Sequence, residues 1–124
     1  MVPIAKQEGS ANIDDLVEIS NNRIVAKFSG QMIISGHCYA KGTGAQQVWV
    51  GAVKYNTAAT SFDILTQSWT STNETAGFTL IVPSKVIKIN RGESIALAGG
   101  SAGGYALATV NATYSGITII CLPD

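Results

Sequence analysis

The stretch from Phe78 to Leu97 limits the fold of this 124-residue chain more than any other segment. Aliphatic side chains fall at every second position on both sides of a polar turn, at Ile87, Ile89, Ile95 and Leu97. A period of two predicts strands with one buried face. The turn, Asn90–Glu93, contains Gly92, the residue best able to adopt positive φ there.

Two interpretations of this turn are open. One is a hairpin whose strands pair directly across a short loop. The other is an arch, in which the chain leaves one sheet at Ile89 and enters a second sheet at Ser94. We favour the arch, because sandwiches built from Greek keys need such crossings between their sheets.

The rest of the chain reads as short strands separated by turns, with no long helix and no repeat. The expected strands are Arg23–Phe28, Gln31–Ala40, Gln46–Tyr55, Phe62–Trp69, Phe78–Val82, Ser94–Ala98, Tyr105–Val110 and Ser115–Leu122. Asp14–Ile19 is compatible with a helical turn or an irregular strand, whereas Thr70–Ala76 and Gly99–Gly104 have the composition of loops. This pattern predicts an all-β fold of about eight or nine short strands, an antiparallel β-sandwich or barrel in one domain, preceded by an arm over residues 1–12.

Composition excludes some partners. Charged residues make up 13% of the chain and the formal net charge is +0, which argues against nucleic acid or an anionic membrane as a partner. Hydrophobic residues reach 46% without an apolar run long enough to span a bilayer. So much apolar material in a small chain suggests burial between subunits. The N-terminus shows no apolar signal core, so we expect no secretion route.

No sequence motif supports catalysis. Gly99–Gly103 has the letters of a Gly-x-Ser-x-Gly nucleophile elbow, but no histidine follows Ser101 to act as its base. The same glycines lack the Lys-Ser/Thr that completes a phosphate-binding loop. His37 is the only histidine, which rules out a histidine-based metal cluster. We therefore expect no enzyme activity, no cofactor and no metal site.

Three blocks of the chain resemble the jelly-roll superfamily of tumour necrosis factor and the complement globular heads. Gly30–Gly42 is similar to its central inner-sheet strand, Val86–Leu97 to the crossing before its sixth strand, and Thr113–Leu122 to its closing strand. The blocks occur in the order of that family. The resemblance implies a ten-stranded jelly roll that assembles as a compact homotrimer. Small phage and viral proteins also use this fold, as capsid cement proteins and as fibre heads.

The trimer contact follows from strand alternation together with this resemblance. In the long strand, Met32, Ile34, Gly36 and Cys38 share one face, and Ile33, Ser35, His37 and Tyr39 share the other. Both faces carry apolar groups, so a lone sandwich would expose one of them to water. The resemblance places the second face on a threefold axis, together with Tyr114, Thr118 and Ile120 of the last strand.

Two further expectations depend on the same pairing. If Gln31–Ala40 and Ile117–Leu122 pair antiparallel, as the resemblance implies, Met32 lies beside Cys121 and Cys38 is on the order of 20 Å away. A disulfide needs Cα atoms within about 7 Å, so both cysteines should be buried thiols. Three copies of His37 near the axis would repel one another once protonated, which predicts a pH-sensitive trimer.

These expectations lead to one function and one alternative. The chain is predicted to be a non-enzymatic virion protein, a capsid cement or decoration protein located on the capsid surface, with the major capsid protein of a virus as its partner. Its polar arm would order against the shell, through Val2, Pro3, Ile4 and Lys6. The alternative is a trimeric fibre-head or extracellular recognition module that binds a glycan or protein receptor through its loops.

Overall fold

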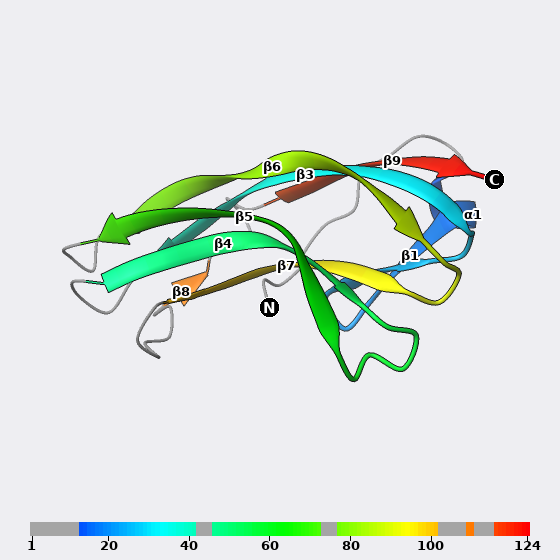
Figure 1. The fold of residues 1–124 in the computed structure, drawn as a ribbon, viewed down its shortest axis with the longest axis horizontal. Coiled ribbons are helices and arrows are strands. Elements are labelled where there is room, and N and C mark those ends of the chain that lie inside the picture. Colours follow the sequence, from blue (N-terminus) through cyan, green and yellow to red (C-terminus); the bar gives the residue numbers. More distant parts are fainter. Residues whose placement is uncertain (1–12, 42–45, 73–76, 102–108, 111–115) are drawn as a thin grey trace.

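The computed structural model describes residues 13–41, 46–72, 77–101, 109–110 and 116–124. These residues form one helical turn and nine strands, most of them long and curved (Figure 1). In chain order the elements are α1 Ile13–Leu16, β1 Val17–Ser20, β2 Arg23–Ala26, β3 Gly30–Lys41, β4 Gln46–Tyr55, β5 Phe62–Thr72, β6 Gly77–Ile89, β7 Ser94–Ser101, β8 Thr109–Val110 and β9 Gly116–Pro123. The ambiguous segment 14–19 contains both predicted elements, a helical turn followed by a strand.

The strands form two antiparallel sheets that pack face to face. One sheet has five strands in the order β1-β2-β7-β4-β5. The other has β3 at its centre, with β6 along one side and with β9 and β8 along the other. This arrangement confirms the predicted all-β jelly-roll sandwich.

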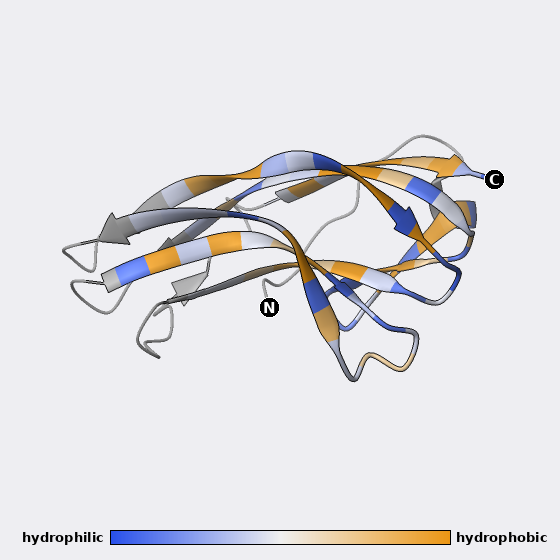
Figure 2. Ribbon diagram, viewed as in Figure 1, coloured by the Kyte–Doolittle hydropathy of each residue, from blue (hydrophilic) through white to orange (hydrophobic). Residues whose placement is uncertain are grey.

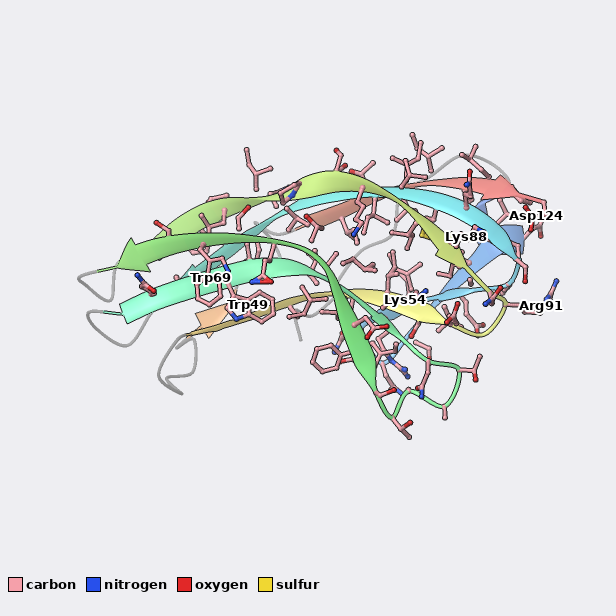
Figure 3. The ribbon with its side chains drawn as sticks, in the orientation of Figure 1. Trp49, Lys54, Trp69, Lys88, Arg91 and Asp124 are labelled. Carbon is pink, nitrogen blue, oxygen red and sulfur yellow. The ribbon has the colours of Figure 1, made fainter. Side chains whose placement is uncertain are left out.

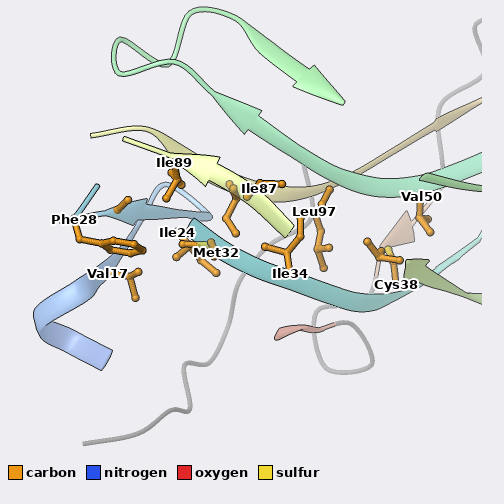
Figure 4. Close-up of a cluster of buried hydrophobic side chains, with 14 residues drawn as sticks. Val17, Ile24, Phe28, Met32, Ile34, Cys38, Val50, Ile87, Ile89 and Leu97 are labelled. Atoms are coloured by element: carbon orange, nitrogen blue, oxygen red, sulfur yellow. The ribbon is translucent and has the colours of Figure 1, made fainter. Parts of the chain in front are cut away.

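The core lies between the sheets and follows the predicted alternation. Met32, Ile34 and Cys38 point inward from β3 and have no exposed surface (Figure 4). Val50 and Ala52 face them from β4, and further aliphatic side chains come from β2, β6 and β7. Burying a large aliphatic side chain contributes about 1.5–3 kcal/mol to folding, so this row of side chains accounts for much of the sandwich's stability.

The segment around Gly92 is an arch, as expected. The chain ends β6 at Ile89 in one sheet and starts β7 at Ser94 in the other. Gly92 has a φ of 90°, and the Glu93 carboxylate accepts a hydrogen bond of 2.7 Å from the backbone N–H of Asn90. Lys54 of β4 lies 3.9 Å from the same carboxylate and donates to the Lys88 carbonyl. These polar contacts tie the two sheets together where the chain crosses.

Edge strands β5 and β6 come together along one side of the sandwich. The Ser68 hydroxyl donates a 2.6 Å hydrogen bond to the Ile81 carbonyl, and the Lys85 ammonium donates a 2.9 Å bond to the Leu65 carbonyl. The pairing of β3 with β6 shifts register between Ile34 and Gly36, where β6 carries Pro83. A proline is tolerated there because β6 is an edge strand and the bulge interrupts the ladder.

Several strand boundaries differ from the sequence prediction, three of them in ways that change an element. Residues 78–82 are not a separate strand, because β6 runs through Pro83 to Ile89. Thr70–Thr72, predicted as loop, extend β5 by pairing with the start of β4. Gly99–Ser101, also predicted as loop, extend β7, because Val48, Trp49 and Val50 supply a complete backbone ladder beside them. Gly99–Ser101 thus lie in a paired strand.

The two cysteines are thiols on neighbouring strands. Met32 pairs with Cys121, as predicted from the antiparallel arrangement of β3 and β9. Cys38 is buried, as expected. Cys121 is half-buried rather than buried, because β9 has no strand from the other sheet fully covering its inner side among the described residues.

Candidate functional site

The outer face of the β6-β3-β9 layer carries a row of aliphatic side chains across three strands. Ile33 on β3 pairs with Val86 of β6 on one side and with Ile120 of β9 on the other. Directly paired residues place their side chains on the same face of a sheet. Val86 is 56% exposed and Ile120 is 52% exposed, while Ile33 lies half-buried between them.

Two more aliphatic residues extend this face. Ile81 pairs with His37 and is 72% exposed, the highest exposure of any large hydrophobic side chain described. Leu122 pairs with Gln31 and is 43% exposed. Figure 2 shows hydrophobic colour along most of β9. We refer to Ile33, Ile81, Val86, Ile120 and Leu122 as the aliphatic face.

His37 and Gly116 fit together within this surface. They are paired residues on β3 and β9, and a Cβ on Gly116 would lie 3.2 Å from Cε1 of the imidazole. The glycine therefore leaves room for the ring to lie against β9. His37 is exposed in the protomer, with Ile81 on its other side.

The structure places most of the predicted contact residues on one surface. Ile33, Ser35, His37 and Tyr39 of β3 point outward, and Ser35 pairs with Thr118 of β9 just as Ile33 pairs with Ile120. Tyr114 and the arm residues Val2, Pro3, Ile4 and Lys6 lie outside the described residues. The role of the surface as a trimer contact remains a prediction.

The sequence reasoning missed three members of the aliphatic face. Ile81, Val86 and Leu122 were not predicted as contact residues, although all three are exposed. Val86 and Leu122 were detectable, because they alternate with the inward-facing Ile87 and Cys121. Ile81 could not be detected from alternation, because the bulge at Pro83 reverses which residues of β6 point outward.

The titratable and metal-ligating groups form no cluster in the part of the chain that the structure describes. No group of three histidine, cysteine, aspartate or glutamate side chains gathers there. Burial raises the pKa of the Cys121 thiol, which packs against the core from β9. None of the described helices has the length and apolar character needed to cross a membrane.

Comparison with known proteins supports the fold. No protein-family model matches the chain, and no sequence of a curated protein matches it. The structure is similar to that of the TNF protein Eiger from S. frugiperda, with a TM-score of 0.66. The match covers 87% of this chain and 69% of that chain at 12% sequence identity. The likeness therefore confirms a TNF-like jelly roll, while function has to be argued from the surface.

Proposed function

We propose that the protein is a non-enzymatic homotrimer whose subunits meet through the aliphatic face. The observation that carries this proposal is the cross-strand row of Val86, Ile33 and Ile120, with Leu122 in the next row on β9 and Ile81 further along β6, opposite His37. Monomeric proteins rarely expose contiguous apolar patches of this kind, and such patches usually mark contacts with a partner. The TNF-like fold supports a threefold arrangement of that contact.

Burial of these side chains between subunits would favour a stable oligomer. Each large aliphatic side chain contributes about 1.5–3 kcal/mol when it passes from water to a fully buried site. A closed trimer buries three copies of every contact residue, so its stability grows with each shared side chain. Light scattering at micromolar concentration should give about three times the protomer mass of 12.9 kDa. A stable monomer would overturn the proposal.

We further propose that the trimer works as a capsid cement or decoration protein. A shell under internal pressure needs clamps where its subunits meet, and a trimer matches the local threefold points. Three copies of each surface act together, so weak contacts add through effective concentration. The low charge content, 13%, favours contacts that resist salt.

Shell binding can be tested by deleting residues 1–12. The trimer should survive, because the aliphatic face lies on β3, β6 and β9, whereas co-sedimentation with capsids should fall sharply. The shells should come from the virus whose capsid gene neighbours this gene. Truncated trimers that decorate shells fully would remove the role of the arm. Full-length trimers that never bind a capsid would remove the cement proposal and leave the trimer intact.

A second candidate function is a trimeric fibre head or recognition module. The observation in its favour is an aromatic pair on the five-stranded sheet, the exposed Trp69 and the half-buried Trp49. Gene position separates the two candidates: neighbouring capsid genes favour cement, and neighbouring tail-fibre genes favour recognition.

A further inference from the structure

The outer face of the five-stranded sheet carries an aromatic row that the trimer proposal does not use. Trp49 on β4 pairs with Trp69 on β5 and with Gly100 on β7, so the three residues form one cross-strand row. Figure 3 shows the two indole rings side by side, away from the arch residues Lys54 and Lys88. Both tryptophans of the chain are in this row.

The two rings form an angled surface, not a closed stack. Their centroids are 6.3 Å apart and their planes are inclined by 43°. Trp49 is half-buried, and a Cβ on Gly100 would lie 2.8 Å from its Nε1. The indole of Trp49 therefore lies directly over the bare backbone of β7. Trp69 is 51% exposed and offers much of its ring to solvent.

The neighbouring rows supply polar groups without charge. Gln47 lies two residues before Trp49 on the same face and is exposed. Gln67 lies two residues before Trp69 on the same face and is half-buried. On β7, Gly100 lies in the row of the two tryptophans and Ala98 lies in the row of Gln67. No described side chain in these three rows carries a charge, while amide donors and acceptors lie on both sides of the rings.

We propose that this face binds a neutral hexopyranose unit of a glycan. The apolar C–H face of a sugar ring would stack on Trp69, with Trp49 closing one side, and the glutamine amides would bond its hydroxyl groups. Binding sites of this type combine a large apolar surface with a few placed polar groups. The absence of charge favours a neutral sugar over a phosphate or a sialic acid.

This proposal goes beyond the trimer and does not need it. The aromatic row and the aliphatic face lie on the outer sides of opposite sheets, so contact through one leaves the other open. A protomer that fails to trimerise can still bind sugar, and failure to bind sugar leaves the trimer proposal unaffected. If both hold, each trimer displays three such sites, and a polymeric glycan would gain from multivalency.

Intrinsic tryptophan fluorescence reads this site directly, because the chain has no other tryptophan. The full-length protein should be titrated with lactose, maltose, cellobiose and N,N′-diacetylchitobiose, and with sialyllactose as an anionic comparison. At least one neutral disaccharide should shift the emission, with a Kd on the order of millimolar. The neutral parent sugar should bind at least as well as its sialylated form.

Variants locate the binding on the aromatic row. Trp69→Ala should weaken binding at least tenfold by saturation-transfer NMR, and Gly100→Ala should weaken it several-fold by displacing the Trp49 ring. Phe62→Ala is the matched control, because Phe62 is 52% exposed on the same strand but lies near the 56–61 loop, and it should leave binding unchanged.

Three outcomes would overturn the proposal. The first is that no neutral sugar binds at a concentration of roughly 10 mM, tenfold above the expected Kd. The second is that Trp69→Ala binds as well as the parent protein. The third is that Trp69→Ala changes the oligomer mass while Phe62→Ala does not, which would assign the ring to a contact between copies of this chain.

Discussion

On the outer face of β6, β3 and β9 the exposed apolar side chains are aliphatic, whereas on the outer face of the five-stranded sheet most of them are aromatic. The aliphatic face is exposed, and no described strand packs over it. The aromatic rings instead have partners within the protomer. Trp69 lies beside Trp49, and the ring centroids of Phe62 and Tyr55 are 5.4 Å apart. Arg23 adds a cation 5.5 Å above the Tyr55 ring.

This difference indicates two different roles for exposed apolar surface. Aliphatic side chains gain only from exclusion of water, so a row of them is stabilised by a second protein layer. Indole rings also carry an N–H group and a polarised face, so they tolerate water and suit a small polar ligand. We therefore assign assembly to the first face and recognition to the second.

The largest effect is expected from breaking the aliphatic face at its centre. Ile33→Lys should convert the trimer to a monomer at micromolar concentration, because three ammonium groups would be brought toward one axis without counter-charges. Light scattering or native mass spectrometry measures the change. Ile64→Lys is the control, since Ile64 is 46% exposed on the other sheet and its change should leave the mass unaltered. A trimer that persists in Ile33→Lys would contradict the assignment.

A second experiment contrasts the inner and outer sides of the sheet that contains β3 and β6. Met32 points into the core and is 0% exposed, so Met32→Ala should lower the free energy of unfolding by about 2–5 kcal/mol. Urea unfolding in an Ile33→Lys background measures this without the contribution of assembly. Ile81→Ala in the same background should change stability by less than about 0.5 kcal/mol, because Ile81 faces solvent in the protomer. Equal losses for the two variants would show that the sides of the sheet are not distinct.

The pH dependence of assembly tests whether His37 lies at the subunit contact. Protonation would place three positive charges within the aliphatic face, beside Ile81 and Gly116, which cannot neutralise them. The trimer should therefore dissociate several-fold more readily at pH 5 than at pH 8. His37→Gln should remove most of this difference. A dissociation constant that is equal at both pH values would exclude His37 from the contact.

The smallest expected effect concerns the inner side of β9. Ile120 points outward and Cys121 points toward the core, where burial raises the pKa of the thiol. Less thiolate is then present at pH 8, so iodoacetamide should alkylate Cys121 a few-fold more slowly in the folded protein than in urea. Peptide mass spectrometry follows the two cysteines separately. Equal rates in both states would show that Cys121 is not shielded by the core.

Local patterns in the sequence were sufficient for most of the fold. Alternation separated the two sides of β3, and the family resemblance placed one of them at the subunit contact; Met32, Ile34 and Cys38 are all buried on the other side. The polar turn with Gly92 left a hairpin and an arch open, and the need of a Greek-key sandwich for crossings between its sheets favoured the arch, which the structure confirms. The pairing of Met32 with Cys121 followed from the family resemblance, which supplied the strand order that alternation alone lacks.

Pairing between strands that are distant in the sequence explains why a segment predicted as loop is part of a strand. Gly99 and Gly100 have the composition of a loop, but the backbone of β4 offers them a complete ladder, and pairing overrides their weak strand propensity. The aromatic row depends on this extension, because Trp49 needs the bare backbone of Gly100 beneath its ring. The sequence shows that the chain has two tryptophans, but it does not show that they share a surface.

The sequence by itself determined which residues share a side of each regular strand, because side-chain direction in a strand alternates with position. It did not determine the outer face of β6. Ile81 and Ile87 have the same parity in the sequence, yet Ile81 is 72% exposed and Ile87 is 6% exposed. The bulge opposite Ser35 inserts an extra residue into β6 and reverses the direction of every side chain beyond it. Only the pairing of β6 with β3 places that bulge, so the composition of the aliphatic face depended on the tertiary structure.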